Sequence, residues 1–343
     1  MLFSEVFGHN KIKDVLINGA KSNRVGHAYI FEGPKGVGKL TMAKAFAMRL
    51  LCETPNADDS CGNCKSCSQC QSQNHPDLQI VTNQLYDSAK KSTDILVDTV
   101  RNMKKEIYIK PYSSERKVYI VPNADTMNVY AQNSLLKVLE EPPEYCTIIL
   151  LAENSNSFLP TILSRAPILK FFPLSESEVS DYLTRCGGDY TAEKVEFAAK
   201  MCGGCIGRAM ELLENFEADA LRSGLMECFF ALAGGRRRSI YDLSLFFKQN
   251  KEDFELIRDM LQGILLDIMY VKNTGSDAHI TNSDKKIKIQ KLADVVGDNC
   301  PVRLNEILFK YSDYFERNIS FSLIAECLSL ELWETINDRG CRN

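Results

Sequence analysis

A glycine-rich segment directly after a short apolar run is the feature that most constrains how this chain folds. Residues 28–32 have the composition of a buried strand, the next seven are Gly33-Pro34-Lys35-Gly36-Val37-Gly38-Lys39, and an alanine-rich helical pattern follows from residue 42 to residue 50. Strand, turn and helix in this order are typical of a P-loop, in which backbone N–H groups, a helix N-terminus and a lysine surround phosphate oxygens. The alternative is a glycine-rich turn that binds nothing. We predict an α/β fold with a nucleotide site at Gly33, Gly36, Gly38, Lys39 and Thr41.

The pattern beyond the P-loop predicts the rest of this fold. Further apolar runs at residues 77–81, 117–121 and 147–152 alternate with helical patterns at residues 92–105 and 128–140. Such alternation indicates a parallel sheet covered by helices on both faces. From Ser175 onward the strand signals fade, and Ser175 with Glu178 predicts a capping box at a helix start. The chain then reads as helical to its end, for example in the apolar repeat from Phe254 to Ile268.

Three positions that a working ATPase needs carry the wrong residue types. The residue after the P-loop lysine should offer a hydroxyl to Mg²⁺, but it is Leu40, and Thr41 is rotated about 100° further around the helix. The strand at residues 117–121 should end in two acidic residues, but Pro122 and Asn123 stand there. We therefore expect weak binding of ATP or ADP and no hydrolysis.

Cysteines cluster just after the P-loop helix. Five of the thirteen fall between residues 52 and 70, with the spacing Cys61-x2-Cys64-x2-Cys67 and Cys52 nine residues earlier. Four thiolates without a histidine or carboxylate form a closed, structural Zn²⁺ site, and we predict one at Cys52, Cys61, Cys64 and Cys67. Cys70 or His75 is an alternative ligand. Free thiols and an iron–sulfur centre are the alternative chemistries.

Charge and hydropathy limit the partners of the chain. Forty-one basic and forty-five acidic residues give a net charge of −4, so uniform wrapping of DNA is not expected and nucleic acid would need a local patch. Gly234-Gly235-Arg236-Arg237-Arg238 is the best candidate for an interdomain linker, with a boundary near Asn215 as the alternative. Contact of its three arginines with phosphates is the less favoured role. The apolar runs are too short to span a bilayer, and the first residues do not read as a signal peptide. We expect a soluble, cytoplasmic protein that makes no membrane contact.

An arginine follows the last predicted strand in the segment Pro160–Ala166. On its own, Arg165 is better explained as a surface or salt-bridge arginine than as a residue that acts on a neighbouring subunit. However, the P-loop, the cysteine insertion, the segment Asn133–Pro143 and Leu163-Ser164-Arg165 occur in this order. In that arrangement the chain resembles the AAA+ clamp loader family of bacterial DNA replication, strongly through about residue 215.

The resemblance implies roles for matched positions. Arg165 would be a finger inserted in trans into the ATP site of a neighbouring motor subunit, in a motif whose third residue is Ala166 instead of cysteine. The four cysteines match zinc ligands of the family, Asn154 lies near its first sensor position, and Arg208 matches its second-sensor motif. The implied domains are a RecA-like AAA+ domain at residues 1–172 with the cysteine cluster at 52–70, a helical lid at 173–218 and a helical collar at 219–343.

The resemblance also implies partners. They are the tau/gamma motor subunits and the delta subunit of the DNA polymerase III clamp loader, a five-subunit ring. Through that complex they extend to the sliding clamp and primed DNA. Pro122 and Asn123 favour a non-hydrolysing ring member. The alternatives are an active motor subunit of the tau/gamma type, or a zinc-dependent nucleic-acid-binding module with a vestigial P-loop.

Overall fold

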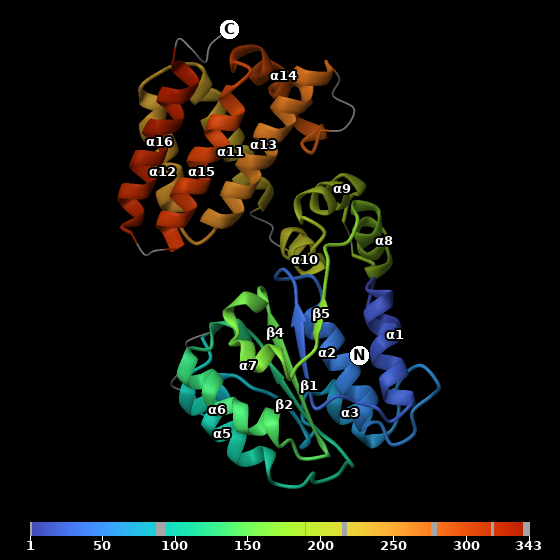
Figure 1. The fold of residues 1–343 in the computed structure, drawn as a ribbon. Helices are drawn as coiled ribbons and strands as arrows, with labels where there is room; N and C mark the ends of the chain where they lie inside the picture. The colour runs from blue at the N-terminus through green and yellow to red at the C-terminus, as the bar shows by residue number, and fades with distance from the viewer. Residues whose placement is uncertain are drawn as a thin grey trace. The chain divides into compact units, whose positions relative to one another are not determined.

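Five parallel strands form the sheet of this protein (Figure 1). The computed structural model describes residues 2–86, 94–188, 190–214, 218–275, 280–316 and 319–338. The strands lie in the order β2-β3-β4-β1-β5 and are β1 (Ala28–Glu32), β2 (Leu78–Ile80), β3 (Lys117–Val121), β4 (Cys146–Ala152) and β5 (Ile168–Lys170). The predicted parallel sheet is confirmed.

The chain divides into two units, which are described separately. The first comprises Met1–Tyr182 and Gly203–Arg208, and the second comprises Leu183–Cys202 and Ala209–Asn343. Residues 173–218, expected as a lid, are shared between both units. The division into three domains at residues 172 and 218 therefore stays a prediction.

Strand β1 occupies an interior position in the sheet, between two strands that come much later in the chain. Ile30 lies opposite Leu150 of β4 on one side and Ile168 of β5 on the other. All pairings are parallel, so the carboxyl ends of the strands meet at one edge of the sheet. Ligands of open α/β sheets bind at this edge, and the segment that follows β1 lies there.

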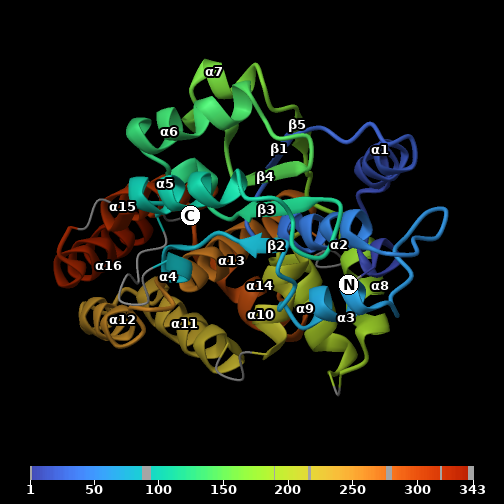
Figure 2. The same cartoon turned by 90° about the horizontal axis from the view of Figure 1, so that it is seen from below.

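Helices cover both faces of the sheet (Figure 2). One face carries α5, α6 and α7, and the other carries α1, α2 and α3. Successive side chains of β1 serve the two faces in turn, since Ile30 packs in the first cluster and Phe31 in the second. The helices of this unit are α1 (Asn10–Lys21), α2 (Lys39–Leu51), α3 (Lys65–Gln71), α4 (Asn83–Tyr86), α5 (Val97–Ile107), α6 (Val129–Glu140) and α7 (Pro160–Leu163), with 3₁₀ turns η1 (Phe3–Glu5), η2 (Ala124–Thr126) and η3 (Ser155–Ser157).

Local sequence signals explain where several helices begin. The Asn128 side chain accepts a hydrogen bond of 2.9 Å from the Ala131 N–H and starts α6 as an N-cap. The predicted capping box is confirmed, because the N–H of Glu178 donates to Ser175 Oγ (3.3 Å) and the N–H of Ser175 donates to the Glu178 carboxylate (2.8 Å). The first two residues of the helix predicted at 92–105 lie outside the described residues, and α5 begins at Val97.

The second unit is helical throughout its described elements. These are α9 (Ala192–Met201), α11 (Ala218–Ala233), α12 (Arg238–Gln249), α13 (Phe254–Thr274), α14 (Lys286–Val295), α15 (Cys300–Glu316) and α16 (Phe321–Asn337), with the 3₁₀ turn η4 (Ser283–Lys285). Helices α8 (Glu176–Cys186) and α10 (Ile206–Glu214) each contribute to both units. The linker prediction at residues 234–238 is wrong. This segment is the turn between α11 and α12, which pack against each other in one unit.

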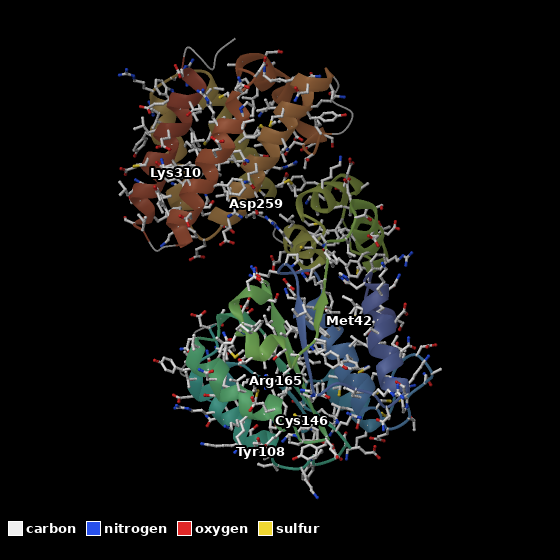
Figure 3. All side chains as sticks on the ribbon, in the orientation of Figure 1. Met42, Tyr108, Cys146, Arg165, Asp259 and Lys310 are labelled. Atoms are coloured by element: carbon white, nitrogen blue, oxygen red, sulfur yellow. The ribbon has the colours of Figure 1, made fainter. Side chains whose placement is uncertain are left out.

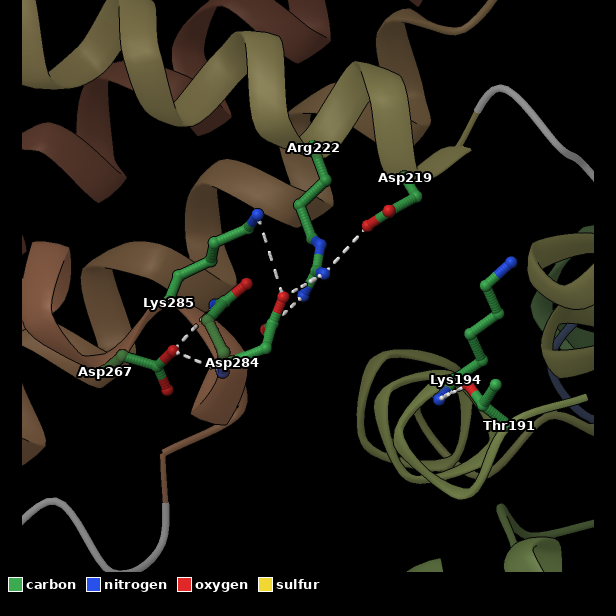
Figure 4. A network of polar contacts seen from close by, with 8 residues as sticks. Thr191, Lys194, Asp219, Arg222, Asp267, Asp284 and Lys285 are labelled. Atoms are coloured by element: carbon green, nitrogen blue, oxygen red, sulfur yellow. Dashed lines mark hydrogen bonds and ion pairs between the residues drawn. The ribbon is translucent and has the colours of Figure 1, made fainter.

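A buried arginine ties three elements of the second unit together. The Arg222 guanidinium, on α11, donates to both carboxylate oxygens of Asp284 (2.8 and 2.6 Å) and to Asp219 (2.8 Å) (Figure 4). Its Cζ lies 4.2 Å from the centroid of the Phe197 ring on α9. Because the arginine side chain is only 7% exposed, these contacts replace most of its hydration and fix α9 and η4 against α11.

Candidate functional site

The P-loop runs from the end of β1 to the first residue of α2. Its glycines allow the backbone to turn sharply, with Gly36 at φ +79° and Gly38 at φ +105°. The Lys39 ammonium lies over the loop and donates to the carbonyl oxygens of Pro34 (2.9 Å) and Gly33. The strand–loop–helix arrangement predicted from the sequence is therefore present.

Acidic groups from two other strands reach the same edge of the sheet. Burial lowers the pKa of Lys39, and the nearby carboxylates of Glu153 and Asp125 oppose that shift. Glu153 follows β4, and its N–H donates to Asp125 Oδ2 (2.7 Å). Asp125 lies in η2, beyond positions 122 and 123, where the two acidic residues of an ATPase would follow the strand.

The missing ATPase residues are replaced by elements of a turn. Asn123 adopts the left-handed conformation (φ +49°), and its carbonyl oxygen accepts a hydrogen bond of 2.7 Å from Thr126 Oγ1. Leu40 is exposed at the start of α2, and Thr41, half-buried, comes one residue later. The arrangement presents no carboxylate at residues 122 and 123 and no hydroxyl at residue 40.

Two other segments rest on the P-loop backbone. The N–H of Gly207, in the first turn of α10, donates to the Gly36 carbonyl oxygen (2.8 Å). From near the N-terminus, His9 Nε2 lies 2.9 Å from the Val37 carbonyl oxygen. Because a carbonyl oxygen can only accept, Nε2 carries the proton. Burial lowers the pKa of His9, which keeps the ring neutral.

The two sensor positions expected from the resemblance lie in the same unit. Asn154 follows β4 and caps η3, where its side-chain oxygen accepts from the Asn156 N–H (2.9 Å). Arg208 comes directly after Gly207, next to the P-loop.

Four cysteine sulfurs converge between α2 and α3. The Sγ atoms of Cys52, Cys61, Cys64 and Cys67 all lie within 4.8 Å of one another, and three of the separations are 3.5, 3.9 and 3.9 Å. Tetrahedral Zn²⁺ with Zn–S bonds of about 2.3 Å requires sulfurs about 3.8 Å apart. The donor set and its spacing therefore fit such an ion, and the cluster can hold a metal.

Backbone amides and a side chain donate hydrogen bonds to the clustered sulfurs, which favours their thiolate form. The N–H groups of Cys61, Cys64 and Cys67 each donate to the sulfur of the preceding cysteine of the cluster, at 3.3 to 3.4 Å. The Thr54 hydroxyl and neighbouring amides lower the pKa of Cys61 to about 6. Burial raises the pKa of Cys52 and Cys67, and a bound cation would reverse that shift, because coordinated thiols are deprotonated.

The two alternative ligands lie elsewhere. Cys70 packs against the core on the α2 face of the sheet, and burial raises the pKa of its thiol to about 12. His75 is buried, and its Nε2 lies 3.3 Å from the hydroxyls of Ser66 and Ser114. Its Nδ1 accepts from the Asp77 N–H (3.0 Å).

Arg165 lies just beyond α7, on the sheet face covered by α6 (Figure 3). One guanidinium nitrogen donates to the Thr161 carbonyl oxygen (3.0 Å) and to Ser164 Oγ (3.1 Å), and the other lies 3.0 Å from a Glu140 carboxylate oxygen. The side chain is 35% exposed. It is held in one orientation and remains accessible to another molecule.

Sequence reasoning missed a basic cavity and several polar anchors. A cavity of about 780 Å³ lies along α4 and α5 and is lined by Arg101, Lys104 and Lys105, among others. The Asp77 carboxylate accepts from the N–H groups of residues 112–114 (2.6 to 2.9 Å). The basic run on α5 is visible in the sequence, but the Asp77 contacts span 35 residues or more and have no local signal.

No helix within the described ranges combines the length and apolar character that crossing a bilayer requires.

Comparison with known proteins agrees with these features. The family model described as "DNA polymerase III, delta subunit" matches residues 8–175. The chain is 28% identical over 346 residues to the DNA polymerase III subunit tau/gamma of Haemophilus influenzae, covering 96% of this chain but 44% of that protein.

Two delta' subunits match over most of their length. The DNA polymerase III subunit delta' of Pseudomonas aeruginosa is 35% identical over 317 residues, covering 92% of this chain and 93% of that protein. The corresponding subunit of Bacillus subtilis is 31% identical over 280 residues, covering 81% and 80%. The chain therefore belongs to the family of delta' subunits of bacterial DNA polymerase III, within the clamp loader group that its motifs resemble.

Proposed function

We propose that this chain is a clamp-loader subunit that does not hydrolyse ATP and that supplies Arg165 in trans to the ATP site of a neighbouring motor subunit. The observation that carries the proposal is a contrast between two sites. The chain's own P-loop is followed by Leu40, and Pro122 and Asn123 follow β3, where Mg²⁺ ligands and a water-orienting group belong. Arg165, by contrast, is oriented by Glu140 and stays accessible.

The physical role of the arginine follows from the chemistry of phosphoryl transfer. Charge accumulates on the γ-phosphate oxygens in the transition state, and a guanidinium inserted from a neighbour stabilises it, an effect of about 10³–10⁵ in rate at one site. The partners in this proposal are tau/gamma motor subunits and the delta subunit in the cytoplasm, acting together on the sliding clamp and primed DNA.

The test is DNA-stimulated ATP hydrolysis by a loader reconstituted with its motor subunits. Arg165→Ala is expected to abolish turnover at the site that receives the arginine, and so to lower turnover of a ring that still assembles. Arg24→Ala removes an arginine from an exposed loop of the same unit and is the matched control. An unimpaired Arg165→Ala ring contradicts the proposal.

The competing motor-subunit function is tested by the P-loop. If this chain hydrolyses no ATP, Lys39→Ala leaves turnover of the ring unchanged, and the isolated chain shows no turnover. Titration calorimetry with ATP and ADP measures the weak binding that the P-loop would retain. Turnover by the isolated chain that Lys39→Ala removes would establish the motor alternative.

We further propose that Cys52, Cys61, Cys64 and Cys67 hold one structural Zn²⁺. When bound, the ion would cross-link the segment between α2 and α3, and four protein ligands leave it no position for a reacting water. Elemental analysis of the purified chain is expected to give one zinc per chain. Iron in place of zinc would support the iron–sulfur alternative instead.

A further inference from the structure

The metal-binding loop contacts the first residues of the chain through one carboxylate. Asp59 lies two residues before Cys61 in the loop between Cys52 and Cys61. Its Oδ1 accepts from the N–H of Phe3 (3.0 Å), and its Oδ2 accepts from the N–H of Ser4 (3.0 Å). Both donors belong to η1, whose first amides have no partner within the turn itself, so Asp59 acts as a cap supplied from a distant segment.

A second contact joins the same two regions. Gly62, between two of the cysteines, lies against Leu2, and a methyl group added there would come within 3.7 Å of Leu2 Cδ2. The Lys13 ammonium donates to the Val6 carbonyl oxygen and lies close enough to Asp59 for their charges to interact. The N-terminal segment, defined here as Leu2–His9, is therefore held along the cysteine loop by polar and apolar contacts.

The N-terminal segment also contacts the P-loop and the helix α2 that follows it. Phe3 is buried, with its ring centroid 6.5 Å from that of Phe46 on α2, the helix that begins at Lys39. His9 donates to the Val37 carbonyl oxygen inside the P-loop (2.9 Å), and its ring packs 4.8 Å from that of Phe171. One continuous segment thus joins the cysteine loop to the P-loop.

We infer that the metal centre anchors the N-terminal segment through Asp59 and that metal binding thereby stabilises the conformation of the P-loop. This inference rests on the proposed metal site. Cys52 and Cys61 lie at the two ends of the loop that carries Asp59. Binding of both cysteines to the metal restricts the conformations of this loop, so less conformational entropy is lost when Asp59 contacts Phe3 and Ser4. Because such coupling is reciprocal, release of the segment must weaken metal binding by the same factor.

The experiment is hydrogen–deuterium exchange of the full chain, with metal content measured on the same samples. Removal of the metal by 1,10-phenanthroline is expected to raise amide exchange in residues 2–9 and 33–39 as well as in the cysteine loop. Asp59→Ala is expected to raise exchange in residues 2–9 roughly fivefold or more, the loss of a capping carboxylate, while the metal is retained. Asp58→Ala is the matched control, because the Asp58 carboxylate pairs with exposed Lys21 instead.

A second variant acts at the other end of the segment and keeps the test independent of how Asp59→Ala folds. His9 has a left-handed backbone (φ +53°), which asparagine tolerates, so His9→Asn removes the Val37 contact without backbone strain. Exchange is then expected to rise at residues 33–39 while residues 2–6 stay protected and the metal stays bound.

Three results would overturn the inference. Unchanged exchange in residues 2–9 after metal removal from a chain that had bound it would show that the metal does not anchor the segment, although the metal site itself would stand. Unchanged exchange in the P-loop, after metal removal and in His9→Asn alike, would remove the coupling to the P-loop. A chain that binds no metal would overturn the metal site and the inference together.

Discussion

The backbone N–H of Gly207 donates a hydrogen bond of 2.8 Å to the carbonyl oxygen of Gly36, so the first turn of α10 rests directly on the P-loop. A Cβ atom at residue 207 would come 2.9 Å from Gly36 Cα and 3.3 Å from its oxygen, which is closer than backbone atoms allow. This contact explains why a glycine precedes Arg208.

Gly207→Ala is therefore expected to force α10 away from the P-loop and to lower the free energy of unfolding by about 1–3 kcal/mol. Gly19→Ala is the matched control, because Gly19 lies in α1 and its added Cβ meets the nearest atom at an ordinary 3.5 Å. That variant should gain about 0.5–1 kcal/mol. Urea titration measures both changes, and equal stabilities of the two variants would show that the close approach does not matter.

Two cysteines three residues apart should respond differently to replacement. Cys67→Ser removes one of the four clustered sulfurs, so the metal content is expected to fall and the thermal midpoint to decrease. Cys70→Ser should retain the metal, since Cys70 packs against the core and its sulfur is not one of the four that cluster. Elemental analysis measures the metal content of both variants. Loss of the metal from Cys70→Ser, with the metal retained in Cys67→Ser, would show that Cys70 and not Cys67 is the fourth ligand.

The stability of the first unit should fall in acid because of Asp77. Burial alone would raise the pKa of this carboxyl, but the N–H groups of Tyr112, Ser113 and Ser114 hold it below its ordinary value. The carboxylate thus contributes stability that is complete above the unfolded-state pKa of about 4 and is lost as the pH falls through the lower, folded-state pKa.

Asp77→Asn is expected to lose about 1–3 kcal/mol at pH 7 and to approach the wild type as the pH falls below 4. Asp58→Asn, at an exposed position, should show neither effect. Denaturant titrations at several pH values test this, and a constant difference between Asp77→Asn and the wild type at every pH would disprove the linkage.

Glu140 should affect catalysis by the reconstituted loader without touching nucleotide in our proposal, because it orients Arg165. Glu140→Gln removes the charge that holds one guanidinium nitrogen at 3.0 Å but leaves the contacts with Thr161 and Ser164. We expect a smaller loss of turnover than in Arg165→Ala, roughly two- to fivefold, because a partly exposed ion pair contributes about 0.2–1 kcal/mol.

Glu141→Gln changes the next residue along the chain and is the control for Glu140→Gln. If Arg165→Ala reduces turnover and Glu140→Gln does not, the positioning role of Glu140 is wrong and the arginine finger stands.

Much of the site was predictable because its signals are local. The P-loop glycines, the capping box at Ser175 and the cysteine spacing each occupy a few neighbouring residues, and the structure places them as expected. Strand β5 was missed because its three residues follow Pro167 and carry no alternation that distinguishes them from a loop.

The contacts that connect the sites were not predictable, because the partners are far apart in the chain. Asp59 meets Phe3 across 56 residues, and the sequence around Asp59 reads as an ordinary polar turn. The position of His9 on the P-loop depends equally on tertiary packing. The linker prediction at residues 234–238 failed because glycines followed by arginines occur both in linkers and in tight turns between packed helices, so composition alone does not separate the two.

The order of strands in the sheet also constrains how the chain can fold as it is synthesised. Strand β1 is made first, yet Ile30 pairs with Leu150 and Ile168, whereas β2 and β3 have their partners closer in sequence. Pairings between residues so distant form slowly, because the entropy cost of closing a long loop must be met before the strand contacts can stabilise the sheet. The P-loop therefore emerges from the ribosome early but gains its full support only after β5 and the first turn of α10 have been made. The cysteine cluster is local, so it can form before β1 has paired with β4 and β5.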